Sequence, residues 1–416
     1  MNNKGIFSTL YIIVALLVAV LCTILVSADT DEPELDAVSA VLIDVHRGQV
    51  LFEKNPDEKL HISSANKIMT ALLSIENESR PDESRVTISR NAVAVEGAVS
   101  NLEVGEQYRV EDLIYSVMLN SSNDSANALA EYIGGDIESF VNLMNQKADE
   151  LGMQDTVFVN PTGLQEDGQY TTAYDMAILT RHALNNPGFE RVFESRVWVW
   201  SEQNDFLQND NKLILSRDDV DGGRIGFNDI ERQTSITSAT RDNMKLVSIV
   251  LDAPKESLDS DSNKLLDYGF ENFKRGILVE KDQRFQIEPI GDEVVYLISI
   301  QDYYYVHPIG TNYIKESYLQ IEDDELTPPV TKDQEVGFVR YVLMDDTAID
   351  VKIYPKDNVY SEMSFFSALI EKLTEYKELA VLIAILIGVE IIIIFYKFIK
   401  MLVNAFIKIK VKFKNG

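Results

Sequence analysis

The sequence predicts an α/β (α+β) fold, in which a mainly antiparallel sheet flanked by helices is followed by a small all-β domain and a C-terminal transmembrane helix. Three observations support this prediction. Strand patterns lie near both ends of residues 33–255, and helical patterns lie between them. Residues 276–360 are rich in short strand patterns, and residues 377–396 contain a long apolar run.

The first domain, residues 33–255, is expected to begin and end with strands of a sheet that helices cover. A turn that ends at Gly48 separates the first two strands, and Arg241-Asp242-Asn243 separates the last two. Between them, apolar residues recur at helical spacing. The predicted strands are Ser39–Asp44, Gln49–Glu53, Thr234–Thr240 and Met244–Leu251, and the predicted helices begin at Ser64 and cover Val110–Leu119 and Ala126–Ile133.

The composition changes after Pro254. Residues 256–275 begin with a polar, acidic stretch and are predicted to be a linker, with one short helix over Leu265–Phe273. The small β-rich domain over 276–360 has no cluster of chemically reactive side chains, so we expect a spacer or a docking module. Its predicted strands include Val294–Ile300, Gly337–Met344 and Ala348–Tyr354.

Residues 1–28 are predicted to be a signal peptide or an N-terminal membrane anchor. An apolar run over Ile6–Val26 follows Lys4, and the small residues Ser27 and Ala28 favour cleavage after Ala28. A retained anchor is the alternative, because the run is also long enough to span a bilayer.

Residues 361–376 are predicted to be a juxtamembrane segment that leads into a transmembrane helix over 377–396. Glu390 opposes insertion by roughly 2.5–3.5 kcal/mol if it is charged at mid-bilayer, and the surrounding isoleucines and leucines offset this cost. The tail over 397–416 carries six lysines and no acid, which marks the cytoplasmic side of the plasma membrane. We therefore expect the bulk of the chain to be extracytoplasmic.

The charge balance and the reactive residues argue against several kinds of ligand. The formal net charge is −29 at pH 7, and binding to nucleic acid needs a basic face, so no nucleic-acid partner is expected. The four histidines lack paired spacing, the chain has one cysteine, and no glycine-rich phosphate loop follows a strand. We therefore expect no metal and no cofactor, and we expect the histidines to be surface or packing residues.

A serine and a lysine one helical turn apart are the first candidates for catalysis. Ser64 and Lys67 share a face at the start of a predicted helix, where free backbone N–H groups stabilise developing negative charge. A neutral Lys67 amine would take the proton of the Ser64 hydroxyl and make it a nucleophile. The structural alternative is that Ser64 is an ordinary helix N-cap.

Two further segments add polar groups that suit a peptide substrate. Ser121 and Asn123 lie in a loop between two predicted helices and offer a hydroxyl for proton relay and an amide for a peptide backbone. The segment 221–227 reads Asp-Gly-Gly-Arg-Ile-Gly-Phe, so its glycines allow close approach to a substrate and Arg224 supplies a cation for a carboxylate. Ordinary loop chemistry and a glycine turn with a surface arginine are the structural alternatives.

The three segments together resemble the motifs Ser-x-x-Lys, Ser-x-Asn and Lys-Thr-Gly of penicillin-binding proteins and serine β-lactamases. The flanking sequences are similar to those of the D-alanyl-D-alanine carboxypeptidases of low molecular mass. These flanks are SSANKIMTALL, MLNSSNDSANALAE, NPTGL, TTAYDMAIL and LLDYGFENF. The resemblance implies the penicillin-binding/serine β-lactamase-like transpeptidase fold for residues 33–255, and it extends to a β domain and a C-terminal membrane anchor.

The resemblance implies a serine-type D-Ala-D-Ala carboxypeptidase, which removes the terminal D-alanine from peptidoglycan stem peptides through an acyl-enzyme. Ser64 would be the acylated nucleophile, Lys67 its base, and Ser121 the proton relay to the leaving amine. Asn123 would hold the peptide, and the backbone N–H groups of Ser64 and Phe227 would form the oxyanion hole. β-Lactams would act as covalent inhibitors.

The third motif departs from the family pattern, because Arg224 and Ile225 precede Gly226 where the family has lysine and threonine. Arg224 keeps the positive charge, can bind a carboxylate with two hydrogen bonds, and helps to keep Lys67 neutral. Ile225 lacks the threonine hydroxyl, whose hydrogen bond to a charged group is worth about 1.5–3 kcal/mol, and its bulk could obstruct the cleft. A slow enzyme is therefore expected, and the alternative is a catalytically degenerate penicillin-binding-like protein that binds wall peptides or partners at the membrane.

Overall fold

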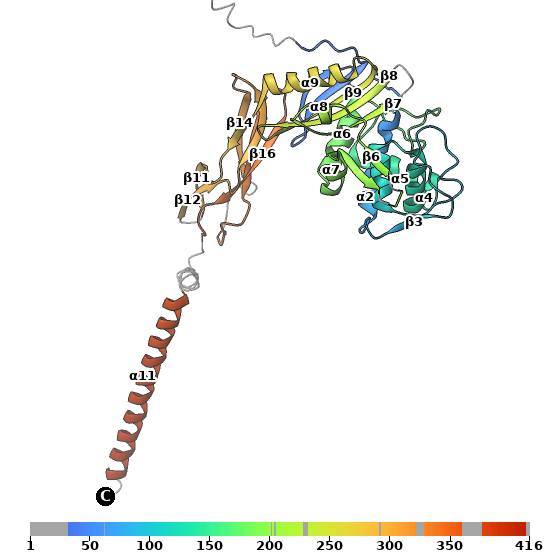
Figure 1. Cartoon of the computed structure of the whole chain (residues 1–416). Helices are drawn as coiled ribbons and strands as arrows, with labels where there is room; N and C mark the ends of the chain where they lie inside the picture. The colour runs from blue at the N-terminus through green and yellow to red at the C-terminus, as the bar shows by residue number, and fades with distance from the viewer. Residues whose placement is uncertain are drawn as a thin grey trace, which may run out of the picture. The chain divides into compact units, whose positions relative to one another are not determined.

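The computed structural model of the chain divides into two compact units (Figure 1). The first unit comprises residues 1–276 and 304–313, and the second comprises residues 277–303 and 314–416. The predicted segments 1–28 and 361–376 lie outside the described residues. The structure describes residues 32–61, 63–200, 202–203, 205–227, 232–290, 293–321, 328–359 and 377–412.

A five-stranded antiparallel sheet forms the centre of the first unit, as the sequence predicts. Its strand order is β2-β1-β9-β8-β7, so the N-terminal hairpin joins the C-terminal strands through the pairing of β1 with β9. The strand β7, which carries the third motif, lies at one edge of the sheet. The strands are β1 Ser39–Asp44, β2 Val50–Lys54, β7 Val220–Phe227, β8 Arg232–Arg241 and β9 Met244–Pro254.

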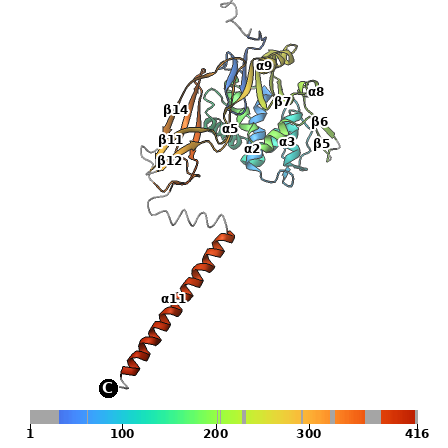
Figure 2. The same cartoon turned by 90° about the vertical axis from the view of Figure 1, so that its left-hand side faces the viewer.

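Both faces of this sheet are covered. Along β1, Val41 and Ile43 pack into an apolar cluster with the helices on one face, whereas Ala40 and Leu42 pack into a second cluster with α9 Leu258–Asn272. Successive strand residues point to opposite faces, so a strand whose six residues are all buried needs cover on both sides. Figure 2 accordingly shows α9 on one side of the strands and α2 and α3 on the other.

The helix α2 is central among the helices that follow the first hairpin, because it contacts α3, α4, α5, α6 and α7. Its apolar residues Ile68, Met69, Leu72 and Leu73 recur every three or four positions and are all buried. The helices are η1 Ser63–Asn66 (a 3-10 helix), α2 Lys67–Asn77, α3 Val110–Leu119, α4 Asn123–Gly134, α5 Ile137–Leu151, α6 Ala173–Leu184, α7 Pro187–Phe193 and α8 Leu213–Ser216. Two small two-stranded sheets complete this region, formed by β3 Arg85–Thr87 with β4 Gln107–Arg109 and by β5 Val197–Trp200 with β6 Asp205–Gln208.

The predicted linker over 256–275 is wrong for most of its length, because α9 occupies Leu258–Asn272 and belongs to the first unit. Its leucines and Phe270 are buried against the sheet. The acidic residue Asp261, which made the segment look solvated, is also buried. Its Oδ2 atom accepts the backbone N–H groups of Asp36 and Ala37 at 2.9 and 2.8 Å, so hydrogen bonds replace the hydration of this oxygen.

The second unit contains the small all-β domain that the sequence predicts. Its five-stranded sheet has the order β11-β12-β16-β15-β14, and buried and exposed residues alternate along β16 as a one-sided sheet requires. The strands are β11 Arg284–Ile290, β12 Glu293–Ile298, β14 Ile314–Ile321, β15 Gly337–Leu343 and β16 Ala348–Pro355. A separate two-stranded sheet is formed by β10 Phe273–Val279 and β13 Tyr303–Pro308, and most of its residues belong to the first unit.

The C-terminal helix α11 covers Lys377–Lys412 and therefore continues beyond the predicted span into the lysine-rich tail. Among the described helices, none meets the combined requirement of length and low polarity for crossing a bilayer. The transmembrane helix thus stays a prediction.

Candidate active site

Ser64 lies in the short helix η1, directly before α2, so the predicted helix begins with a tighter 3-10 turn. The residue is 8% exposed. The edge strand β7 approaches η1 closely because Gly226 has no side chain. A Cβ at Gly226 would lie only 2.5 Å from Ser63 Oγ and 3.0 Å from the Ala65 nitrogen. The glycine of the third motif therefore allows the contact between the first and third motifs.

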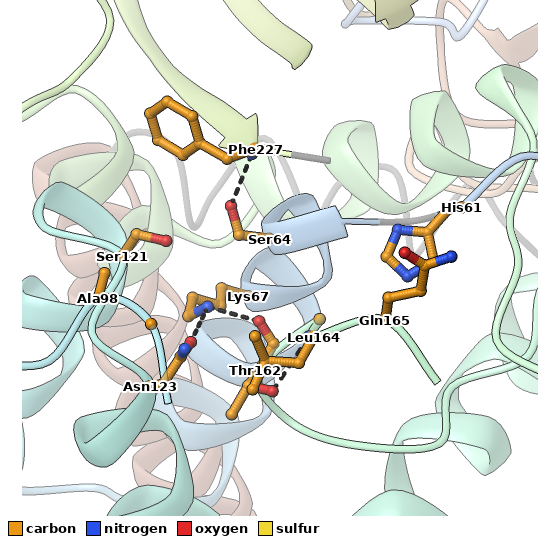
Figure 3. A pocket seen from close by; sticks show the side chains of 12 residues that line it. His61, Ser64, Lys67, Ala98, Ser121, Asn123, Thr162, Leu164, Gln165 and Phe227 are labelled. Atoms are coloured by element: carbon orange, nitrogen blue, oxygen red, sulfur yellow. Dashed lines mark hydrogen bonds between the residues drawn. The ribbon is translucent and has the colours of Figure 1, made fainter. Parts of the chain in front are cut away.

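The backbone N–H of Phe227 donates a hydrogen bond to Ser64 Oγ at 3.2 Å (Figure 3). An N–H group that points at the hydroxyl oxygen is also close to the place where the oxygen of an attacked carbonyl would lie. This geometry suits the predicted oxyanion hole, for which Phe227 supplies one of the two donors.

Lys67 is buried, with 1% of its surface exposed. Its Nζ donates to Asn123 Oδ1 at 2.7 Å and to the backbone carbonyl of Thr162 at 2.5 Å. Burial, and then the positive charge of Arg224, hold the pKa of Lys67 well below its ordinary value. A neutral amine has two N–H groups and one lone pair, so these two bonds leave the lone pair free to accept a proton.

Asn123 begins α4 and links two parts of the site. Its Oδ1 accepts the bond from Lys67, and its Nδ2 donates to the backbone carbonyl of Glu96 at 2.6 Å. A Cβ at Gly97, whose φ is +88°, would lie 2.8 Å from that Nδ2. One Nδ2 hydrogen remains for a substrate carbonyl, since an amide nitrogen carries two.

Arg224 reaches the predicted site but is not an exposed ligand for a substrate. It is 2% exposed, and its guanidinium donates to the backbone carbonyl of Ser64 at 2.9 Å and to Ser121 Oγ at 3.1 Å. It also donates to the carbonyls of Val117 and Met118 at 2.8 and 2.7 Å, at the C-terminal end of α3. Four of its five N–H groups are therefore used within the protein, so the predicted bidentate grip on a carboxylate is wrong.

The charge of Arg224 persists at neutral pH. Burial lowers the pKa of Arg224 to about 10, and the Asp210 carboxylate opposes that shift. The negative end of the α3 dipole also favours a cation at this place. The buried guanidinium therefore acts on the neighbouring Lys67 as a fixed positive charge.

Ile225 points to the other face of the sheet from Arg224, because side chains alternate along β7. It is 7% exposed and packs in the apolar cluster with α9. It does not belong to the residues that line the pocket beside Ser64. The predicted obstruction of the cleft is therefore wrong, whereas the expected loss of rate from the missing hydroxyl stays a prediction.

The three motifs converge on one pocket of about 180 Å³ (Figure 3). Ser121, at φ +55°, lies on one side of Ser64, and His61 lies on the other. In the described part of the chain, no group of His, Cys, Asp or Glu side chains gathers as metal ligands. The pocket is lined by His61, Ser64, Lys67, Gly97, Ala98, Ser121, Asn123, Thr162, Gly163, Leu164, Gln165 and Phe227.

The loop that contributes Thr162 is recognised in the sequence only as the flank NPTGL, and no role is predicted for Thr162. Its function is carried by a backbone carbonyl, for which no side chain gives a signal. The loop is fixed to η1 by a bond from Asn66 to the Asn160 carbonyl at 2.6 Å and to α2 by one from Thr70 to the Pro161 carbonyl at 2.7 Å. Gly163, with φ +75°, was the available signal, because a glycine in the left-handed region marks a tight turn.

A family model for D-alanyl-D-alanine carboxypeptidase matches residues 26–255. The chain belongs to this family. The D-alanyl-D-alanine carboxypeptidase DacF of Bacillus subtilis is 32% identical over 321 residues, which cover 74% of this chain and 82% of that protein. DacC of Escherichia coli is 31% identical over 353 residues, which cover 81% of this chain and 87% of the relative.

Solved structures give the same family. Penicillin binding protein 5 from Haemophilus influenzae has 28% sequence identity and a TM-score of 0.67, and the match covers 79% of this chain and 99% of that one. The predicted family and the predicted penicillin-binding type of fold are confirmed.

In this carboxypeptidase family member, Gly163→Ala is expected to lower the rate of acylation by penicillin by about tenfold or more. The new Cβ would overlap the backbone carbonyl of Ser63 and lie 2.9 Å from Asn66 Cβ, so the loop would move and take the Thr162 carbonyl away from the catalytic amine. The measurement is the rate of fluorescent penicillin labelling. The matched control is Gly168→Ala, where φ is also positive, at +88°, but no heavy atom lies within 4 Å. Equal rates in the two variants would contradict the expectation.

The pH dependence of acylation is expected to follow the neutral form of Lys67. The rate should rise as pH passes upward through the pKa of Lys67, because only the deprotonated amine accepts a proton. Arg224→Met removes the like charge that lowers this pKa, so the midpoint of the rise should move to higher pH.

A pH series of labelling rates with Arg217→Met as control tests this shift. Arg217 is paired with Asp219 at 3.0 Å, so it provides an arginine outside the pocket. An unchanged midpoint in Arg224→Met, in folded protein, would show that Arg224 does not set the basicity of Lys67.

Proposed function

We propose that this protein removes the terminal D-alanine from peptidoglycan stem peptides through an acyl-enzyme on Ser64. The observation that carries the proposal is one pocket in which a buried, deprotonation-prone amine and a backbone N–H donor flank a serine hydroxyl. That combination is the minimum for acyl transfer by a serine, since it supplies a nucleophile, a base and a site for the oxyanion.

In the acylation step, Lys67 Nζ takes the proton of the Ser64 hydroxyl while Oγ forms a bond to the carbonyl carbon of the penultimate D-alanine. The negative carbonyl oxygen lies between the N–H groups of Ser64 and Phe227. When the tetrahedral intermediate collapses, the C–N bond breaks, Ser121 Oγ gives its proton to the nitrogen, and the Lys67 ammonium gives its proton to Ser121, so that the amine is neutral again. D-Alanine leaves with its amine.

Ser121 suits this relay because Arg224 donates to its oxygen. The hydroxyl proton of Ser121 therefore points elsewhere and is free to go to the leaving group. The terminal carboxylate of the substrate lies on this side of the pocket, where the buried charge of Arg224 attracts it through space without a direct bond.

In the deacylation step, water attacks the ester carbon and gives a proton to the Lys67 amine. The Lys67 ammonium then gives this proton to Ser64 Oγ as the ester bond breaks, and the shortened peptide departs. A β-lactam follows the first step, but its leaving nitrogen stays attached to the acyl group, so the adduct on Ser64 persists.

The proposal is tested with the full chain and a peptide that ends in D-Ala-D-Ala. We expect free D-alanine to appear in amounts well above one per protein, and penicillin to stop its release. Digestion and mass spectrometry should place the penicillin adduct on Ser64. A folded protein that neither releases D-alanine nor forms an adduct would be a non-catalytic homologue, and the proposal would fail.

We also propose that the protein is held at the plasma membrane by residues 377–396, with the catalytic domain and the small β domain outside the cytoplasm and the lysine-rich tail inside. Support comes from α11, in which Val381 and most apolar side chains over 385–398 are exposed, and from the lysine-rich sequence at its end. Fractionation of cells that produce the full chain, or a chain ending at residue 376, tests this location. Equal recovery of both chains in the soluble fraction would contradict it.

A further inference from the structure

His61 lies at the end of the pocket opposite Ser121, with Ser64 between them (Figure 3). Its Nδ1 accepts the backbone N–H of Ser63 at 3.2 Å. Its Nε2 is buried and has no hydrogen-bond partner among the residues that the structure describes. No sequence pattern places this histidine at the site, and from the sequence only a surface or packing residue is expected.

The bond from Ser63 determines the protonation of the ring. Because Nδ1 accepts a hydrogen bond, the proton of a neutral imidazole must be on Nε2. Burial also lowers the pKa of His61, which favours the neutral ring at pH 7. His61 therefore presents one N–H donor, at Nε2, that no described residue uses.

An unused buried donor is unfavourable in the empty pocket, because the group has lost water without gaining a partner. A ligand that brings an acceptor oxygen removes this penalty. Gln165, which also lines this end of the pocket, is exposed on the loop after Gly163. The wall of the pocket beside His61 is thus the Gln165 side chain, which solvent reaches and which a ligand can displace.

The direction of the substrate determines which part meets His61. Under the proposed function, on which this inference rests, the leaving D-alanine lies on the Ser121 side. The acyl part of the peptide must then extend past Ser64 in the opposite direction, toward His61 and Gln165. The group in reach is the residue that precedes D-Ala-D-Ala.

We propose that His61 is a substrate-positioning residue whose Nε2–H binds an acceptor oxygen on the residue preceding D-Ala-D-Ala. The oxygen belongs to the peptide carbonyl or to a side-chain carboxylate of that residue. His61 thereby favours stem peptides over the bare dipeptide.

Two substitutions separate this role from the hydrogen bond that His61 Nδ1 accepts from the Ser63 backbone N–H. His61→Asn keeps an acceptor near the Nδ1 position and removes the Nε2 donor. His61→Gln keeps a donor near the Nε2 position and gives up the acceptor. The measured quantity is kcat/KM for a long peptide divided by kcat/KM for N-acetyl-D-Ala-D-Ala, in the full chain.

We expect His61→Asn to lower this ratio roughly three- to tenfold, as the loss of one hydrogen bond requires, and His61→Gln to keep it near the wild-type value. His182→Asn is the matched control, because His182 lies outside the pocket and pairs with Glu76 at 3.3 Å. Its ratio should equal that of the wild type.

Two long peptides that differ in one side-chain carboxylate, free or amidated, identify the acceptor. A loss with both peptides assigns the peptide carbonyl, and a loss with the free carboxylate alone assigns the side chain. If His61→Asn lowers both rates equally, or if His61→Gln lowers the ratio more, His61 only supports Ser63 and the inference is overturned. A wild type that turns over neither substrate overturns the proposed function as well.

Discussion

Ser64→Ala is expected to abolish covalent labelling by fluorescent penicillin and to lower D-alanine release by on the order of 10⁴-fold or more. The alanine side chain has no oxygen to form the ester, and the remaining donors bind a substrate without a covalent path. The substitution should hardly affect folding, because the side chain receives only one bond, from the Phe227 N–H, and alanine fits the same space. A denaturing gel after labelling gives the answer.

The matched control is Ser63→Ala, which removes the neighbouring hydroxyl. Ser63 Oγ is buried and has no hydrogen-bond partner in the described part of the chain, so its loss should leave labelling within a few fold of the wild type. If Ser64→Ala were still labelled, the nucleophile would be another residue, and Ser121 would be the next hydroxyl to replace.

Lys67→Met is expected to lower the acylation rate about 10²- to 10⁴-fold, which is the usual contribution of a general base. Methionine fills a similar volume without an amine, so the Ser64 proton has no acceptor. The substitution also leaves Asn123 Oδ1 and the Thr162 carbonyl without their shared donor, which should destabilise the fold by about 1–3 kcal/mol for each unpaired group.

The rate and the stability can be measured apart. The acylation rate is obtained at several pH values by stopping the reaction with fluorescent penicillin after different times. Thermal unfolding shows how much of the protein is native. Lys59→Met is the control, because Lys59 is a half-exposed lysine that pairs with Asp155 at 2.9 Å. If Lys67→Met were acylated at the wild-type rate over the whole pH range, another group would have to be the base.

Much of this fold was predictable because its signals are local. The strand Ser39–Asp44 is apolar throughout and has the predicted bounds, and Val110–Leu119 has the predicted helical bounds. The three motifs could be placed together only by family resemblance, since their convergence depends on contacts between residues as far apart as Ser64 and Arg224.

The features that the sequence did not reveal depend on partners from elsewhere in the chain. Asp261 looked like part of a linker, but backbone N–H groups of the N-terminal segment allow it to be buried. Arg224 looked like a free cation, but carbonyls at the end of α3 already occupy it. His61 looked unremarkable, because only the turn beside Ser64 brings it to the pocket.

The enclosure of Arg224 has a consequence for the ionic conditions in which the protein works. Dissolved ions weaken attraction and repulsion between exposed charges over about 10 Å at 0.1 M salt, but they cannot enter between groups that are almost fully covered by protein. The lowering of the Lys67 pKa by the Arg224 charge should therefore persist at high salt concentration. The reactivity of Ser64, which depends on a neutral Lys67, should therefore change little with the salt concentration.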